Sequence, residues 1–350
     1  MRHTAIFRVI LALLGLLAAQ GALAEPAGYL LGEKHVSYTD ESRPIKASMG
    51  FAGSPTRRLD VLVWYPAAKG GIDGAAAKGG PWPLLLFSHG TYGHADGFMH
   101  IVNDLVAHGY VVAAPDYPLT SRAAWTRIKD PDISDVAQQV RDDRFLLDRL
   151  IADPAIGPMI DKDRIAAGGH SLGAVTSYFL GYGVQTRDPR VKALVLVGAG
   201  DPVQAALSQD MGLFGTAHAA APLPVLFLSA EKDVFARMMG RAHAAYFRVE
   251  PPKYEVMVKR GAHVWFHAEM DQHPQGKNPD CLFFERMSPT MKVPGCEGPE
   301  EMIDPVRQQA ITLAAMRSFL DGYLKRDAAA LSRLRTLDKA FPEAELILSE

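Results

Sequence analysis

The chain has 350 residues, of which 48% are hydrophobic, and a formal net charge of −2. A charge this close to zero argues against a nucleic-acid partner and against electrostatic capture of a strongly charged one. Beyond the N-terminus, no stretch approaches 18 unbroken apolar residues, so we expect no membrane-spanning helix.

Residues 1–24 have the pattern of a signal peptide. Arg2 and Arg8 are followed by the short apolar run VILALLGLLAA, and Ala22-Leu23-Ala24 fits the small-x-small rule for cleavage before Glu25. The pattern predicts a periplasmic or extracellular protein without stable membrane insertion. A retained N-terminal anchor is the alternative.

Strand and helix patterns alternate along the rest of the chain. Repeated strand–helix units with apolar strands predict an α/β fold, a mostly parallel central sheet with helices on both faces. We expect one domain over 25–350, with an irregular segment at 266–304. The predicted strands cover 57–66, 83–90, 110–118, 163–171, 191–200, 224–233 and 253–263, and the predicted helices cover 98–110, 134–153, 172–183, 236–247 and 304–324, with a helical tail to residue 350.

Ser171 lies in the stretch RIAAGGHSLGAV, between a predicted strand and a predicted helix. The motif G-x-S-x-G, with Gly169 and Gly173, bends the chain sharply and exposes the serine hydroxyl at the edge of a sheet. A glycine-rich packing turn is the alternative. The strand–turn–helix setting favours a nucleophile.

A serine nucleophile needs a base and an acid that orients it, and both are expected after later strands. His263, in VKRGAHVWF, follows the alternating strand after a glycine turn. Asp233 ends the strand before it, and we favour it as the acid because these two strands are consecutive. Asp201 and Glu231 remain the alternatives.

The negative charge that develops on a carbonyl oxygen needs two N–H donors. Leu172 follows the nucleophile and opens a helix, so its N–H is free of intrahelical partners. The stretch FSHGTYG runs from an early strand into a glycine turn, and we expect Thr91 to supply the second donor.

Four stretches, LLLFSHG, GGHSLG, LFLSAEKD and RGAHVWF, together resemble the α/β-hydrolase superfamily. Within it the chain is similar to the dienelactone-hydrolase-like and platelet-activating-factor acetylhydrolase branch, over about residues 57–325 without the cysteine segment. Two departures matter. Dienelactone hydrolases use a cysteine where this chain has Ser171. Gly198 stands near the place where the acetylhydrolases carry their acid, which favours Asp233.

The predicted function is hydrolysis of small-molecule or lipid-like carboxylic esters through an acyl-enzyme, without a cofactor. An amidase or peptidase with the same residues, and a non-catalytic binding protein on this fold, are the alternatives. The sequence leaves the oligomeric state open.

Substrate contacts are expected from aromatic residues in loops over the sheet edge: Tyr92, Trp125, Phe214, Trp265 and Phe266. Ordinary packing of these aromatics is the alternative.

The cysteines, Cys281 and Cys296, are 15 residues apart and are expected to form a disulfide in an exported chain, with two free thiols as the alternative.

A metal site could be built from the stretch HVWFHAEMDQH, with His263, His267, Glu269, Asp271 and His273. Histidines four apart bind a metal when they share a helix face. The glycine turn before them favours a loop, so we expect no metal.

Overall fold

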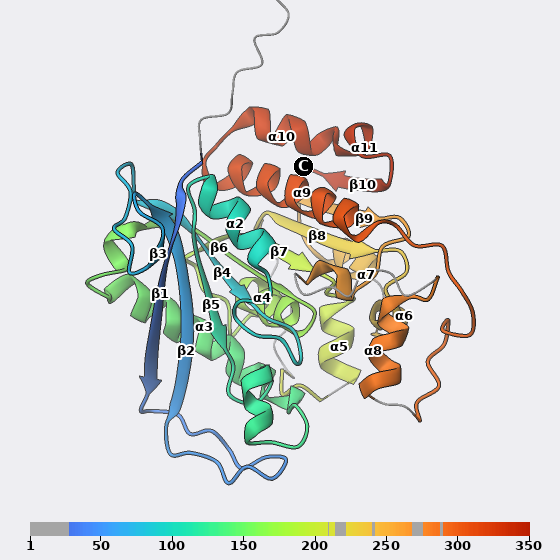
Figure 1. Ribbon diagram of the computed structural model, residues 1–350, viewed down its shortest axis with the longest axis horizontal. Helices are drawn as coiled ribbons and strands as arrows, with labels where there is room; N and C mark the ends of the chain where they lie inside the picture. Colours follow the sequence, from blue (N-terminus) through green and yellow to red (C-terminus); the bar gives the residue numbers. More distant parts are fainter. Residues whose placement is uncertain (1–27, 209, 214–221, 240–241, 268–275, 288–289) are drawn as a thin grey trace, which may run out of the picture.

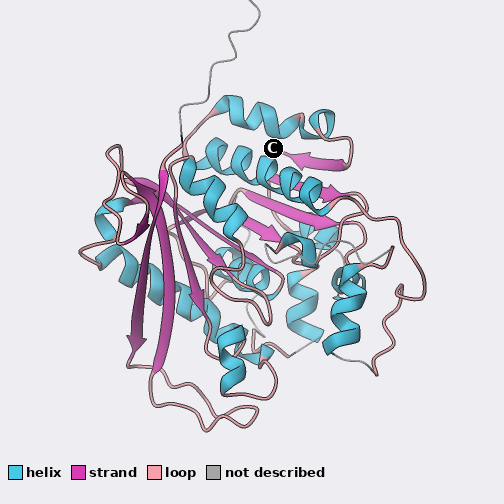
Figure 2. Cartoon of the chain, in the orientation of Figure 1, coloured by secondary structure: helices cyan, strands magenta, loops and turns pink. Residues whose placement is uncertain are grey.

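A twisted sheet runs through the molecule and carries helices on both faces (Figure 1, Figure 2). The computed structural model describes residues 28–350 apart from 209, 214–221, 240–241, 268–275 and 288–289. Ten strands make up the sheet within these residues, in the order β10-β9-β8-β7-β6-β4-β5-β2-β1-β3. The strands are β1 Leu30–Asp40, β2 Arg57–Ala67, β3 Gly71–Ile72, β4 Trp82–Ser88, β5 Val111–Asp116, β6 Ile160–His170, β7 Val191–Val197, β8 Val225–Ala230, β9 Lys253–Val258 and β10 Ala344–Ser349.

The centre of the sheet is parallel, as the apolar strand runs predict. Strands β5, β4, β6, β7, β8 and β9 pair in parallel, while β2 and β10 join the two sides of this block in antiparallel pairing. Parallel strands are covered on both faces, which explains why β4 is buried at every position. The expected mostly parallel sheet with helices on both faces is confirmed.

Helices cover the two faces because alternate side chains of each strand point to opposite sides. In β4, Leu84 and Leu86 belong to one hydrophobic cluster, and Leu85 and Phe87 belong to the other. The helices are α2 Met99–Ala107, α3 Val136–Ala152, α4 Leu172–Tyr182, α5 Pro202–Ser208, α6 Val234–Met239, α7 Ala242–Arg248, α8 Pro279–Met287, α9 Pro305–Leu324, α10 Ala328–Arg335 and α11 Leu337–Ala340. Helices α3 and α4 pack on the first face, and α2 and α9 pack on the second.

Strands β1 and β3 and helix α5 were not predicted, and three further parts of the chain differ from the sequence-based expectation. The tail predicted to be helical ends in strand β10, which pairs with β9 at the edge of the sheet. The helix predicted over 236–247 is replaced by two helices, α6 and α7. The segment 266–304, expected to be irregular, contains helix α8.

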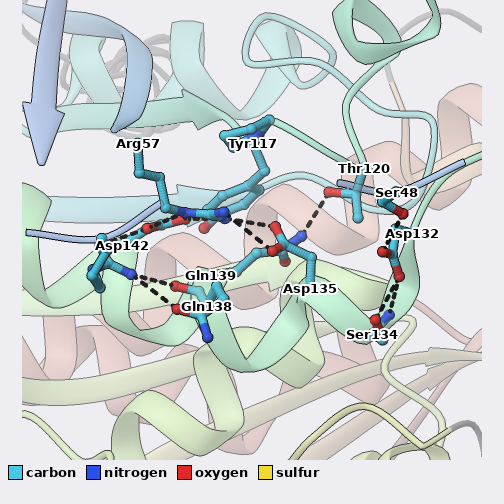
Figure 3. Close-up of polar contacts among 12 residues, drawn as sticks. Ser48, Arg57, Tyr117, Thr120, Asp132, Ser134, Asp135, Gln138, Gln139 and Asp142 are labelled. Carbon is cyan, nitrogen blue, oxygen red and sulfur yellow. Dashed lines mark hydrogen bonds and ion pairs between the residues drawn. The ribbon is translucent and has the colours of Figure 1, made fainter. Parts of the chain in front are cut away.

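A buried polar network ties β2 to α3 below the sheet edge (Figure 3). Arg57 is fully buried and binds the carboxylates of Asp135 and Asp142 with five hydrogen bonds of 2.6–3.1 Å. Between these two aspartates, on α3, lies Gln139, whose side chain donates to Thr120 Oγ1 at 2.6 Å. This network anchors the N-terminal strands to the helix layer, because a buried charge is tolerated only where it is paired.

The parallel strands place functional side chains at one edge. The carboxyl ends of β4, β6, β7, β8 and β9 face the same way, so the loops that follow them meet there. Those loops begin after Ser88, His170, Val197, Ala230 and Val258.

Candidate active site

Ser171 occupies a strained turn between β6 and α4. Its φ and ψ angles are 55° and −119°, a conformation that side-chain-bearing residues rarely adopt. The flanking glycines permit the bend, since a Cβ on Gly173 would lie 2.1 Å from the Ser88 carbonyl oxygen. The Ser171 N–H donates to the Val197 carbonyl at 2.8 Å, which fixes the turn against β7.

His263 and Asp233 form a buried pair at the same edge. His263 follows the turn after β9, and its Nδ1 lies 2.8 Å from Asp233 Oδ2. Each residue is only 2% exposed. His263 and Ser171 line the same cavity, although no hydrogen bond between them occurs among the described residues. Such bonds often tighten only when substrate binds.

The two alternative acids lie elsewhere and serve other contacts. The Asp201 side chain caps α5 by accepting from the N–H of Val203 at 3.1 Å, and it pairs with Arg248. The Glu231 side chain accepts from the Arg260 N–H at 2.8 Å and shapes the turn before His263. The structure therefore places Asp233 alone of the three against the imidazole.

Gly198 leaves room for the contact between Asp233 and His263. It follows β7 with a φ of 57°, and a Cβ at this position would lie 3.0 Å from His263 Nδ1. A side chain here would reach the same nitrogen that Asp233 binds, so the position must stay small when the acid comes from the next strand.

The two residues predicted to donate backbone N–H groups lie directly after the serine and in the loop after β4. Leu172 is the first residue of α4, and Thr91 follows Gly90, whose Cβ would meet Ser171 Cβ at 3.0 Å. Within the described residues, neither the Leu172 nor the Thr91 N–H donates to a protein acceptor. The next N–H, of Tyr92, is engaged with the Thr120 carbonyl at 2.9 Å, which holds the loop in place.

The pKa of His263 is set by opposing effects. Burial disfavours its charged form, but the charge and hydrogen bond of Asp233, with a further contribution from Asp280, raise the pKa above the ordinary value. His170 faces the same ring, with the two ring centroids 4.5 Å apart. Burial lowers the pKa of His170 well below its ordinary value, and the proximity of His263 adds to this. His170 is therefore neutral at pH 7.

Sequence reasoning missed Asp280, the second residue of α8. Its side chain is fully buried and accepts backbone N–H bonds from Val234, His263 and Val264 at 3.0–3.1 Å. Burial, followed by the nearby Asp233, raises its pKa to about 6, while His263 and the backbone bonds lower it. The carboxylate lies 17 residues from His263 in sequence, so no local pattern signals this contact.

A largely apolar cavity of about 690 Å³ opens above Ser171. Phe235 stacks on the His263 ring with centroids 4.3 Å apart, and Phe283 lies 5.6 Å from Phe235. These aromatic residues were not anticipated, because they come from α6 and α8, whose positions only the fold reveals. Apolar residues in the wall include Val175, Met211, Phe235, Trp265, Leu282 and Phe283.

The aromatic residues expected at the substrate site have mixed outcomes. Tyr92 and Trp265 line the cavity. Phe266 does not; it is fully buried in the core cluster of the second face, because the short helical turn after His263 points it inward. The Trp125 side chain and all of Phe214 lie outside what the structure describes.

The predicted disulfide is present. Cys281 and Cys296 are bonded, with their Cα atoms 5.6 Å apart, and join α8 to the loop before α9.

Of the possible metal ligands, Glu269, Asp271 and His273 lie outside the described residues. Among the residues that are described, no group of three or more histidine, cysteine or acidic side chains is arranged to hold a metal ion.

None of the described helices is long and apolar enough to cross a membrane.

A sheet of this order, with a serine at the turn from β6 to α4, defines the α/β-hydrolase fold. The sequence profile of the alpha/beta hydrolase family matches residues 85–337, and the chain belongs to this family. Among solved structures, it is similar to a ferulic acid esterase from Streptomyces cinnamoneus. The TM-score is 0.64 and the identity 21%, over 93% of this chain and 98% of the esterase chain, a level that shows the fold alone. No curated protein sequence matches the chain.

Proposed function

We propose that this protein hydrolyses carboxylic esters through an acyl-enzyme formed on Ser171, with His263 as the base and Asp233 as the orienting acid. One observation carries the proposal. His263, which is paired with the buried Asp233, and the strained Ser171 turn border one cavity, beside two N–H groups that bind no protein acceptor among the described residues. Metal-free acyl transfer needs these parts.

Each step follows from this arrangement. His263 takes the Ser171 hydroxyl proton on Nε2 while the oxygen attacks the ester carbonyl carbon. The Leu172 and Thr91 N–H groups bind the oxyanion. When the tetrahedral intermediate collapses, imidazolium returns the proton to the leaving alcohol. Water then repeats the cycle with His263 as base, which releases the acid and restores the serine.

Asp233 keeps the imidazole in the productive orientation. Its carboxylate binds Nδ1, so the proton on that nitrogen stays in place and Nε2 is left as the basic atom. The raised pKa of His263 has the same source, since the negative charge favours imidazolium in each intermediate.

The cavity wall favours esters with an apolar acyl or aryl group. Aromatic and aliphatic side chains from α4, α6 and α8 surround a volume suited to a small organic molecule. The similarity to a ferulic acid esterase supports a substrate whose acid part carries an aryl group. Placement in the dienelactone-hydrolase-like or acetylhydrolase branch rests on the four sequence stretches alone.

We also propose that the protein acts outside the cytoplasm as a single hydrolase domain over residues 25–350. The N-terminal pattern of charge, apolar run and small residues supports export, and the Cys281–Cys296 bridge suits an oxidising compartment.

The first experiment measures hydrolysis of p-nitrophenyl esters from acetate to palmitate by the protein and by Ser171→Ala. We expect turnover by the wild type and a loss of at least about 10³-fold in kcat for the variant. A fluorophosphonate probe should label the wild type only. A Ser171→Ala variant as active as the wild type would refute the assignment.

The same assay separates the rival functions. Equal turnover of a matched p-nitroanilide would favour an amidase. Neither ester turnover nor phosphonate labelling would favour a binding protein. The chain length of the best ester reports the size of the pocket.

A further inference from the structure

Asp280 connects helix α8 to the two loops that carry Asp233 and His263. Its Oδ2 accepts from the N–H of Val234 at 3.0 Å and of His263 at 3.1 Å, and its Oδ1 accepts from the N–H of Val264 at 3.0 Å. Val234 follows Asp233 directly in the chain. One carboxylate on α8 therefore binds the backbone of both loops that supply the Asp233–His263 pair.

The carboxylate is an expensive group to bury. Asp280 is 0% exposed, and within the described part of the chain it has no lysine or arginine partner. Loss of water around an ionised carboxylate is costly unless hydrogen bonds and an opposite charge compensate. The three N–H bonds supply part of this compensation. The imidazolium of His263 is the cation that can supply the rest.

The charged and titratable groups around the pair are few. Asp233 contacts His263 Nδ1 from the end of β8, and Asp280 faces both from α8. His170 faces the His263 ring from the end of β6 and is neutral, because burial holds its pKa well below the ordinary value. The two carboxylates are therefore the charges that act on His263 among these neighbours.

We propose that Asp280 is a positioning residue, which holds the Asp233 and His263 loops in register and stabilises the protonated imidazole with its negative charge. The inference rests on the proposed function, in which His263 is neutral before each attack and becomes protonated in each tetrahedral intermediate. It also gives α8 a second role beside its aromatic contribution to the cavity.

The test compares Asp280→Asn with the wild type. An asparagine nitrogen cannot accept, so at least one of the three backbone N–H groups loses its partner and the charge is gone. We expect kcat to fall about 10- to 100-fold. We also expect the acidic limb of kcat/KM to move to lower pH, because loss of the negative charge lowers the pKa of His263.

Two further variants complete the test. Asp188→Asn is the matched control, because Asp188 is a buried carboxylate paired with Arg190 away from the cavity. It should lower the unfolding temperature and leave the acidic limb in place. Asp280→Glu keeps the charge and displaces it, so it should lower kcat with the limb unmoved.

An NMR titration of the His263 ring reads the same effect without turnover. The ring signal is assigned by its loss in His263→Gln. If the wild type neither hydrolyses esters nor reacts with a fluorophosphonate, the proposed function fails, yet the titration still decides the role of Asp280.

The proposal is overturned if Asp280→Asn titrates as the wild type does and is merely less stable, as Asp188→Asn is. If Asp280→Asn does not fold, Asp280→Glu decides: a fall in kcat at near-wild-type stability supports the proposal, and a kcat equal to that of the wild type overturns it.

Discussion

Gly198 shows how one missing side chain allows the Asp233–His263 pair to form. A Cβ at this position would lie 3.0 Å from Nδ1 and 3.1 Å from Cε1 of His263. The backbone is also left-handed there, with a φ of 57°. Both constraints favour glycine, and both come from the position of the histidine loop rather than from the local sequence.

Gly198→Ala should therefore lower both the free energy of unfolding and kcat/KM, and the kinetic loss should exceed that of a glycine replaced at a similar backbone conformation elsewhere. The left-handed backbone costs about 1–2 kcal/mol for alanine, and the methyl group displaces the imidazole, so we expect kcat/KM to fall about 10- to 100-fold. Thermal unfolding and ester kinetics measure the two effects separately.

Gly109→Ala is the matched control for backbone strain. Gly109 follows α2 and has a φ of 80°. A Cβ at this position would lie 3.5 Å from its nearest neighbour, an ordinary van der Waals contact. The variant should lose similar stability and keep its activity. Equal kinetic losses in the two variants would contradict the role assigned to Gly198.

Helix α8 is one of the elements that sequence reasoning overlooked. It begins at Pro279, a favoured first helical position, and carries Asp280, Cys281 and Phe283. The helix has only nine residues and lies within a segment rich in proline and glycine, which is why the surrounding pattern predicts irregular structure. Its packing against α6, rather than its own propensity, accounts for its place in the fold.

The disulfide should stabilise this element directly. Its two cysteines are 15 residues apart, and closing a loop of that length contributes about 3 kcal/mol at 25 °C. Changing both cysteines to serine should lower the free energy of unfolding by about this amount. Because α8 forms part of the cavity wall, KM should rise for long or aryl esters and stay nearly constant for the acetate.

Urea denaturation of the oxidised and the dithiothreitol-treated protein checks this prediction. The reductant should shift the wild-type midpoint and leave the double serine variant unchanged. A wild-type midpoint that does not respond to reduction would show that α8 is held by its other contacts.

At the scale of the whole molecule, the fully buried Arg57 links the N-terminal strands to the helix layer. Arg57 on β2 pairs with Asp135, the residue before α3, and with Asp142, within α3. All three side chains are almost fully buried (Figure 3). Removal of Arg57 is costly, because Asp135 loses its buried cation and Asp142 keeps only the partly exposed Arg43, 2.8 Å away.

Arg57→Met should lower the free energy of unfolding by about 3–5 kcal/mol at pH 8. Burial already raises the pKa of Asp135 to about 6 with Arg57 present, and loss of the arginine raises it further. The folded variant then binds protons that the unfolded chain, with a carboxyl pKa near 3.8, does not. Its stability therefore improves as the pH falls from 8 to 5.

Urea denaturation at the two pH values measures this difference. The neighbouring Arg58→Met is the control, since its ion pair with Asp60 is more than half exposed on both sides and should contribute at most about 1 kcal/mol. A loss for Arg57→Met that does not depend on pH would mean that the carboxylates are not the cause.

The amino-acid pattern alone predicts the α/β class, the position of Ser171 between a strand and a helix, and the histidine after strand β9. These features are local: apolar runs, glycine spacing and chain order report them directly. The folded arrangement was needed to show which acid contacts His263, that Phe266 points into the core, and that Asp280 and Phe283 reach the site from α8. Such contacts join residues far apart in the chain, and they depend on how loops pack at the carboxyl edge of the sheet, where side-chain burial and hydrogen bonding, rather than local pattern, select the arrangement.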